Sequence, residues 1–197
     1  TAPSTAAPDL LDIGIPVAKR PLHFIIVADC SGSMLGDKIQ SLNFAIRETI
    51  PLMRDAAKQN PNVEVLARAI RFSNGASWHV ETPTPIDQFQ WRDLSVDGMT
   101  DFGAALRLLK QALDVPPMSE RSVPPVILLV SDGHPTDEWK SSMEALRRLP
   151  WAVKAMRVAI GIGHDVDLNM LRQFATPEIE PLQANNPEAL LAYIRWS

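Results

Sequence analysis

Oxygen-bearing side chains are concentrated in one short stretch near the start of the chain. Asp29, Ser31 and Ser33 alternate there with Cys30 and Gly32. Carboxylate and hydroxyl oxygens suit a hard divalent cation such as Mg²⁺, which favours oxygen ligands in octahedral geometry. Serine and aspartate are also common in turns and helix caps. This stretch alone is therefore compatible with a cation site or with simple capping.

Two later segments offer further oxygen donors. Thr100 lies just ahead of a predicted helix, and Asp132 follows an apolar run and precedes Gly133. Each has an ordinary alternative role, because threonine is a frequent helix N-cap and Asp-Gly is a common turn pair. The choice between these roles depends on whether the fold brings the three segments together.

Two apolar runs are predicted to be the strands that position these side chains. The run over 22–28 stops at Asp29, and the run over 124–130 stops at Ser131. Apolar runs with β-branched residues are typical of parallel strands buried on both faces. Ligands of open α/β sheets bind at the carboxyl ends of such strands. We therefore expect Asp29 and Asp132 at one edge of a sheet.

Strand and helix patterns alternate along the rest of the chain. Further strands are predicted at 63–72, at 76–81 (a short antiparallel edge strand, followed by a connecting segment over 82–99), at 154–161 and at 179–182. Helices are predicted from Asp37 with a kink or restart at Pro51, from just after Thr100 to Pro116, after a cap at Thr136 or Asp137, at 167–174 and at 187–196. This order predicts a doubly wound, Rossmann-like α/β fold, with a mainly parallel central sheet and helices on both faces.

The oxygen-bearing segments resemble the motifs of a known family. They are Asp29-Cys30-Ser31-Gly32-Ser33-Met34, Gly98-Met99-Thr100-Asp101-Phe102-Gly103-Ala104-Ala105-Leu106 and Ser131-Asp132-Gly133. In type and order they are similar to those of a von Willebrand factor type A (vWA) domain with a complete metal-ion-dependent adhesion site (MIDAS). We place this domain at 21–197, after an N-terminal extension over 1–20 that we expect to be partly mobile. Within the family, Ser33-Met34-Leu35-Gly36 and the string from Asp132 to Asp137 look most like bacterial TerY-like proteins, which are associated with tellurite resistance and stress.

The resemblance implies a role for each candidate ligand. Ser31 and Ser33 would coordinate the metal through their hydroxyls, and Thr100 would do so when a ligand is engaged. Asp29 and Asp132 would act directly or through water. The cation would be Mg²⁺, with Mn²⁺ or Ca²⁺ as alternatives, and it would accept a Glu or Asp side chain from a partner protein. The implied function is metal-dependent protein binding rather than catalysis.

Two other functions are compatible with parts of the pattern. An acid at the end of a first strand also suits Mg²⁺-dependent phosphoryl transfer, but haloacid-dehalogenase-type phosphatases need Asp-x-Asp, and here the second position is Ser31. Gly32 to Gly36 also lacks the Gly-Lys-Ser/Thr ending of a phosphate-binding loop. The second alternative is a metal-independent scaffold that binds its partner through helices or the edge strand.

Composition narrows the class of partner. The net charge of −4 argues against nucleic acid or an anionic membrane as partner, since both are normally met by a basic surface. The single cysteine, Cys30, cannot form an internal disulfide, which favours a reduced, cytoplasmic setting. The oligomeric state is left open by the sequence.

Three further residues have alternative interpretations. Cys30 is expected to pack away from the oxygen ligands, because side chains alternate along a strand. His134 is interpreted as an exposed loop residue or as a rim contact for a ligand. Asp167, in the string His164-Asp165-Val166-Asp167, is interpreted as a helix cap in preference to a metal ligand.

Overall fold

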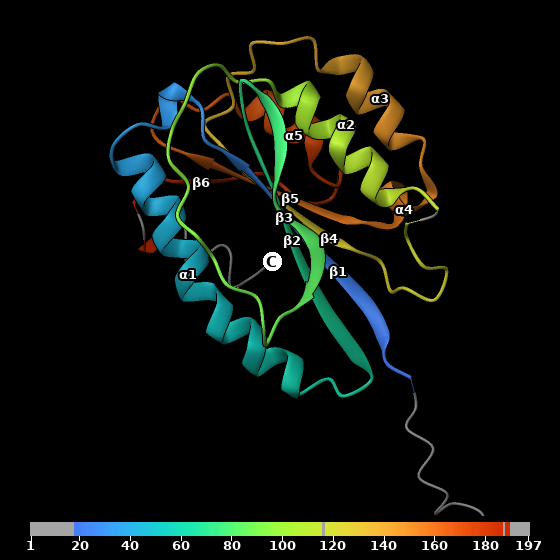
Figure 1. Cartoon of the computed structure of the whole chain (residues 1–197). Helices are drawn as coiled ribbons and strands as arrows, with labels where there is room; N and C mark the ends of the chain where they lie inside the picture. The colour runs from blue at the N-terminus through green and yellow to red at the C-terminus, as the bar shows by residue number, and fades with distance from the viewer. Residues whose placement is uncertain (1–17, 116, 187, 190–197) are drawn as a thin grey trace, which may run out of the picture.

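The computed structural model describes residues 18–115, 117–186 and 188–189. A six-stranded sheet with strand order β3-β2-β1-β4-β5-β6 forms its centre (Figure 1). The strands are β1 (Arg20–Asp29), β2 (Val63–Ser73), β3 (Gly75–Pro85), β4 (Val126–Ser131), β5 (Met156–Ile162) and β6 (Leu182–Ala184). All neighbouring pairs are parallel except β2 with β3, which is antiparallel. The predicted doubly wound, mainly parallel fold is confirmed.

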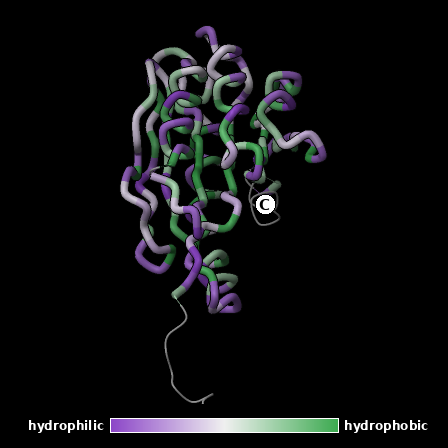
Figure 2. The backbone as a smooth tube through the Cα atoms, turned by 90° about the vertical axis from the view of Figure 1, so that its right-hand side faces the viewer, coloured by the Kyte–Doolittle hydropathy of each residue, from purple (hydrophilic) through white to green (hydrophobic). Residues whose placement is uncertain are grey.

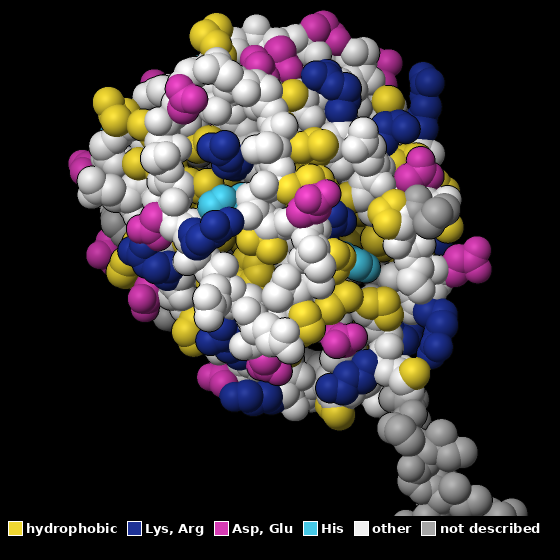
Figure 3. Space-filling model, viewed as in Figure 1, with side chains coloured by type: hydrophobic (Ala, Val, Ile, Leu, Met, Phe, Trp, Pro, Cys, Tyr) yellow, Lys and Arg dark blue, Asp and Glu magenta, His cyan; other side chains and the backbone are white. Residues whose placement is uncertain are grey.

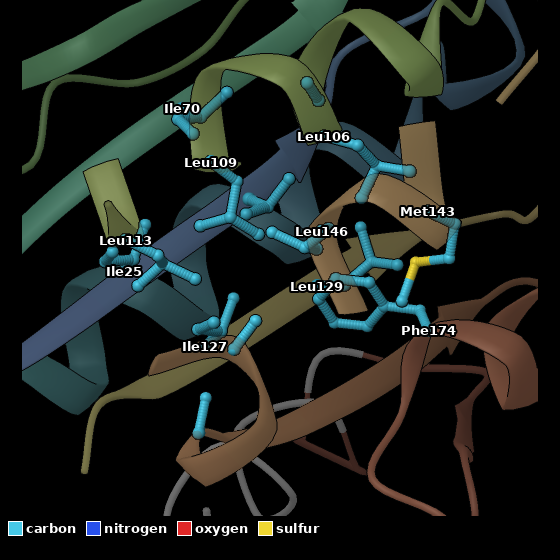
Figure 4. Packing of buried hydrophobic residues seen from close by; sticks show 14 of the residues in the cluster. Ile25, Ile70, Leu106, Leu109, Leu113, Ile127, Leu129, Met143, Leu146 and Phe174 are labelled. Carbon is cyan, nitrogen blue, oxygen red and sulfur yellow. The ribbon is translucent and has the colours of Figure 1, made fainter. Parts of the chain in front are cut away.

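Helices cover both faces of this sheet. They are α1 (Asp37–Lys58), α2 (Phe102–Leu113), α3 (Lys140–Arg147), α4 (Pro150–Lys154) and α5 (Leu168–Phe174), with a 3₁₀ turn, η2, at Gly32–Met34. One buried cluster joins α1 to one face of the sheet. A second cluster joins α2, α3, α4 and α5 to the other face, where Leu106, Leu146 and Phe174 pack over Ile25, Ile127 and Leu129 (Figure 4). Figure 2 shows the hydrophobic residues concentrated in the central strands.

The edge strand β3 is longer than predicted. It spans 11 residues and includes Thr82 to Pro85, which we expected to begin a connecting segment. Pro85 pairs with Leu66 of β2 after a register shift near Ala69. Proline is tolerated because an edge strand can turn its missing donor away from the ladder. Proline was therefore a poor signal for the end of this strand.

Of the two outcomes predicted at Pro51, a kink or a restart, the restart of helix α1 is wrong. The helix runs through 22 residues with Pro51 inside. Pro51 and Arg47, whose carbonyl loses its helical donor, are both exposed, so water can replace that hydrogen bond. Ile46 and Ile50 stay buried against the sheet and maintain the helix across this point.

Three other boundaries differ from the predictions. Helix α3 begins at Lys140 with no side-chain cap, so neither Thr136 nor Asp137 caps it. The short helix α4 was not predicted, and β6 overlaps the predicted strand over 179–182 only at Leu182. Of the predicted helix over 187–196, only Glu188 and Ala189 are described, and both are helical. Most of the N-terminal extension also lies outside the described residues. No helix in the described part of the chain is long and apolar enough to span a bilayer.

Candidate functional site

The site begins where β1 and β4 end side by side. Asp29 is the last residue of β1, and the pairing of β1 with β4 brings it beside Ser131. The Ser131 hydroxyl donates a hydrogen bond of 2.6 Å to Asp29 Oδ2. Asp132 follows immediately, and both aspartates are fully buried. The structure therefore brings together two carboxylates that are far apart in the sequence, as the strand pattern predicted.

The loop after β1 adds two hydroxyls. The Ser31 amide donates to Asp29 Oδ1 at 2.9 Å, which turns the chain back over the end of its own strand. The Ser31 and Ser33 hydroxyls are 3.1 Å apart, so they present a pair of oxygens on one side of the loop. Met34, fully buried, anchors the 3₁₀ turn beneath them. Ser31 is buried, whereas Ser33 is exposed at the rim.

Thr100 reaches this edge from the loop before α2. The Gly32 amide donates to the Gly98 carbonyl at 2.9 Å, which joins the loop after β1 to the loop that carries Thr100. A side chain at Gly32 would bring a Cβ to 3.2 Å from the same carbonyl, so the two loops would have to move slightly apart to accommodate it. Thr100 is buried and is not a helix cap: the residue at the N-cap of α2 is Asp101.

A third loop holds Thr100 in place. The Thr100 amide donates to the Thr136 hydroxyl at 3.0 Å, and the Thr136 amide donates to the Thr100 carbonyl at 2.9 Å. Asp137 accepts from the Gly103 and Ala104 amides at 3.0 and 3.2 Å. Thr136 and Asp137 therefore fix the start of α2, although the sequence suggested that they cap α3. No local pattern signals a cap supplied from another loop.

The carboxylates of this site are incompletely neutralised. Burial raises the pKa of Asp29, and the hydrogen bonds from Ser131 and Ser31 only partly offset that rise. Asp132 Oδ2 lies 3.3 Å from the ammonium of Lys38, but Asp132 Oδ1 is buried with no hydrogen-bond partner. Sequence reasoning missed Lys38. The available signal was a lysine in the first turn of a helix, where the helix dipole disfavours a positive charge.

The oxygens present fit a hard divalent cation. An orphaned, buried carboxylate oxygen is costly unless it meets a cation or a donor. Among the described residues, no group of three or more His, Cys, Asp or Glu side chains is placed to hold a metal. A metal at this edge would therefore depend on hydroxyls as well as on Asp29 and Asp132, a donor set that suits Mg²⁺, Mn²⁺ or Ca²⁺ better than a soft metal.

The remaining candidates have structural roles. Cys30 is buried, and its Sγ lies 3.4 Å from the Phe72 carbonyl, while burial raises the pKa of its thiol. His134 is exposed in its loop, in agreement with the first of its two interpretations, and its ring contacts the Asp165 carbonyl. Asp167 accepts from two amides at the start of α5, at 3.0 and 3.3 Å, so its predicted role as a cap is confirmed.

Comparison with known proteins decides the family. Residues 24–188 match the von Willebrand factor type A domain. The chain belongs to the vWA family. A search of curated proteins finds no match to its sequence. The vWA domain is known chiefly as an interaction module, and the match covers the strands and loops that carry all five candidate ligands.

Solved structures show the same fold at low sequence identity. A von Willebrand factor type A protein from Catenulispora acidiphila superposes with a TM-score of 0.68 at 17% identity, over 90% of this chain and 42% of that one. Proximal thread matrix protein 1 from the mussel byssus, with a zinc-occupied MIDAS motif, gives 0.66 at 18% identity, over 91% and 47%. BatB from Bacteroides thetaiotaomicron gives 0.62 at 14% identity, over 89% and 96%. This vWA domain thus spans under half the length of the first two proteins.

Proposed function

We propose that this vWA domain is a metal-dependent protein-binding module. Asp29, Ser31, Ser33, Thr100 and Asp132 would hold a divalent cation, Mg²⁺ by preference and Mn²⁺ or Ca²⁺ as alternatives. The cation would accept a Glu or Asp side chain from a partner protein. The observation that carries the proposal is the buried Asp132 Oδ1 without a partner, beside a second buried carboxylate, at an edge where the loop of Ser31 and Ser33 is hydrogen-bonded to the loop that leads to Thr100.

The composition of the donor set favours ligand binding over a closed structural metal. A bound cation supplies a centre of positive charge at the surface. Asp29 and Asp132 carry two negative charges, but Asp132 is also paired with Lys38, so part of the cation's charge stays uncompensated, which favours one more anionic ligand from outside. Ser33 is exposed and Ser31 lies beneath it, so the solvent-facing side of a cation bound at these hydroxyls would stay open to a ligand. A partner carboxylate is the natural anion to complete such a shell.

Two features support a protein partner over a polyanion. The face of the molecule in Figure 3 has basic and acidic side chains interspersed, with no extended basic patch. The net charge is −4.

One structural neighbour carries zinc in its MIDAS motif, which supports a divalent cation in this type of site. A role in a bacterial stress or tellurite-resistance system rests only on the two short strings noted in the sequence.

A Mg²⁺-dependent phosphoryl-transfer enzyme is the weaker alternative. Haloacid-dehalogenase-type phosphatases use such a layout, but they need Asp-x-Asp after the first strand as a nucleophile/acid pair. Position 31 holds a serine instead, whose hydroxyl lies 3.1 Å from a second serine and whose amide binds Asp29. A metal-independent scaffold remains the other alternative, and it predicts partner binding that ignores chelators.

The test measures cation binding and its dependence on the hydroxyls. Calorimetric titration of Mg²⁺ and of Mn²⁺ into the chelator-treated protein is expected to show one site in the wild type and none in a Ser31→Ala/Ser33→Ala variant. Ser141→Ala, an exposed serine on α3, serves as the matched control and should bind as the wild type does. Equal binding by wild type and the double variant would contradict the proposed ligand set. Turnover of a phosphatase substrate that is lost in Asp29→Ala would favour the enzyme instead.

A further inference from the structure

A lysine contacts one of the candidate metal ligands. The Lys38 Nζ lies 3.3 Å from Asp132 Oδ2 and 3.4 Å from Asp165 Oδ1, and the Lys38 side chain is 23% exposed. Its two partners differ strongly in environment, because the side chain of Asp132 is 1% exposed and that of Asp165 is 75% exposed. Lys38 therefore spans from the buried centre of the site to its solvent rim.

The surroundings of Lys38 are shaped to admit it. Gly163, with a φ of +106°, lies against the lysine stem. A Cβ at that position would come within 2.6 Å of Lys38 Cε and 3.1 Å of Nζ, so a larger residue at 163 would displace the end of the lysine side chain from this position. Lys38 also lies in the first turn of α1, where a positive charge is unfavourable to the helix dipole. Its placement is thus explained by Asp132 and Asp165 and not by the helix.

The two oxygens of Asp132 have different partners. Oδ2 faces the Lys38 ammonium, and Oδ1 is buried with none. A divalent cation that takes Oδ1 would share this carboxylate with Lys38, and the two positive charges would repel each other at short range. Lys38 is the only Lys or Arg among the described residues that forms an ion pair with Asp132.

We propose that Lys38 is a resident counter-charge that sets the metal affinity of this site. It neutralises Asp132 when the site is empty and weakens the binding of the divalent cation when the site fills. This inference rests on the proposed function, and it adds a role for a residue outside the five ligands. Its consequence is a site that stays folded without metal and binds the cation reversibly instead of trapping it.

A purely structural salt bridge would behave differently. If Lys38 only ties the start of α1 to the loops around Asp132 and Asp165, then its removal destabilises the protein equally with and without metal. Cation affinity would then stay the same or fall as the loops loosen. The counter-charge role requires affinity to rise when the lysine charge is removed, which loosened loops do not produce.

The experiment compares Lys38→Gln with two controls. Lys38→Arg keeps the positive charge, and Lys58→Gln removes the same charge from the far end of the same helix, where Lys58 pairs only with exposed Asp55. Mn²⁺ is titrated calorimetrically into each chelator-treated protein. We expect Lys38→Gln to bind Mn²⁺ about tenfold more tightly, roughly 1.4 kcal/mol, and Lys58→Gln to match the wild type. Lys38→Arg should stay within about threefold of the wild type.

Thermal melting provides a second measurement, which can also be made on a variant that is too unstable for calorimetry. The melting temperature of each protein is measured with EDTA and with saturating Mn²⁺. Lys38→Gln should melt below the wild type in EDTA and gain more than the wild type when Mn²⁺ is added. Equal affinity, or an equal loss of melting temperature in both conditions, would overturn the role of Lys38 while leaving the metal site intact. Absence of Mn²⁺ binding in wild type and variant alike would overturn the metal site and this inference together.

Discussion

At the scale of single residues, Asp29 is held at each oxygen by a different segment. The Ser31 amide donates to Oδ1 at 2.9 Å, and the Ser131 hydroxyl donates to Oδ2 at 2.6 Å. Ser131 in turn accepts from the Gly133 amide at 2.9 Å. The orientation of the carboxylate is therefore fixed before any ligand arrives. The cost is a buried charge, which these hydrogen bonds only partly offset.

Ser131→Ala tests this support. Removal of the hydroxyl leaves Asp29 Oδ2 and the Gly133 amide without a partner inside the protein, so we expect a loss of about 1–3 kcal/mol in the free energy of unfolding. Urea denaturation of the metal-free protein measures it. Ser77→Ala, on the exposed side of β3, should stay within about 0.5 kcal/mol of the wild type. If Ser131→Ala unfolds at the same urea concentration as the wild type, this hydrogen bond does not contribute to stability.

The raised pKa of Asp29 predicts a pH dependence of stability. Burial is the main cause of the rise from the ordinary value of 3.8. Because the folded pKa lies above the unfolded one, the folded state binds more protons between the two values. The contribution of Asp29 to stability is therefore complete below pH 3.8 and is lost as pH rises through the folded pKa.

Asp29→Asn isolates this contribution from that of the other carboxyl groups. In EDTA, the free energy of unfolding of the wild type should fall relative to that of Asp29→Asn as pH increases from 4 to 7. Denaturant titrations at several pH values provide the measurement. A difference that is constant with pH would mean that the Asp29 carboxyl has the same pKa in both states.

At the scale of elements, the sequence predicted the ends of the two central strands but not the caps supplied by distant loops. The apolar runs that stop at Asp29 and Ser131 located the site edge correctly, because a buried parallel strand leaves a local signature. The predicted roles of Thr136 and Asp137 were wrong, since they bind the start of α2 across sequence separations of 36 and 34 residues. Lys38 escaped notice for the same reason: its partners are distant in sequence.

Asp137→Ala tests the cap supplied from that loop. The variant frees the Gly103 and Ala104 amides at the start of α2, and loss of a cap costs about 0.5–2 kcal/mol. Because the same loop holds Thr100, we also expect weaker Mn²⁺ binding, measured by calorimetry alongside the unfolding free energy. Glu144→Ala, an exposed acid on α3, is the matched control and should alter neither quantity. Unchanged Mn²⁺ affinity in Asp137→Ala would show that this cap does not contribute to metal binding.

At the scale of the whole molecule, the candidate site joins loops from both halves of the sheet. β1 carries Asp29, and β4 leads into Asp132 next to it. The Asp132 carbonyl also accepts from the Asp167 amide in the loop after β5, at 3.3 Å. A ligand bound at this junction interacts only with the folded chain, so it must stabilise the entire domain.

Metal binding should therefore raise global stability. At a free Mg²⁺ concentration one hundred times its dissociation constant, linkage predicts a gain of about 2.7 kcal/mol in the free energy of unfolding. Thermal melts with increasing Mg²⁺, reversed by EDTA, measure the effect. Asp132→Asn should abolish most of the gain. A melting temperature that ignores Mg²⁺ and Mn²⁺ in the wild type would argue against the site as a whole.

The central position of β1 also has a consequence for synthesis of the chain. One side of β1 pairs with β2 soon after it is made, but the other side pairs with β4, and the residue that meets Asp29 there comes 102 residues later. At ordinary translation rates this interval lasts on the order of 5 to 20 seconds. During that time an apolar strand presents unpaired amides and carbonyls, which are a template for pairing with other nascent chains. The strand that carries Asp29, β1, is thus the one most exposed to misassembly during synthesis.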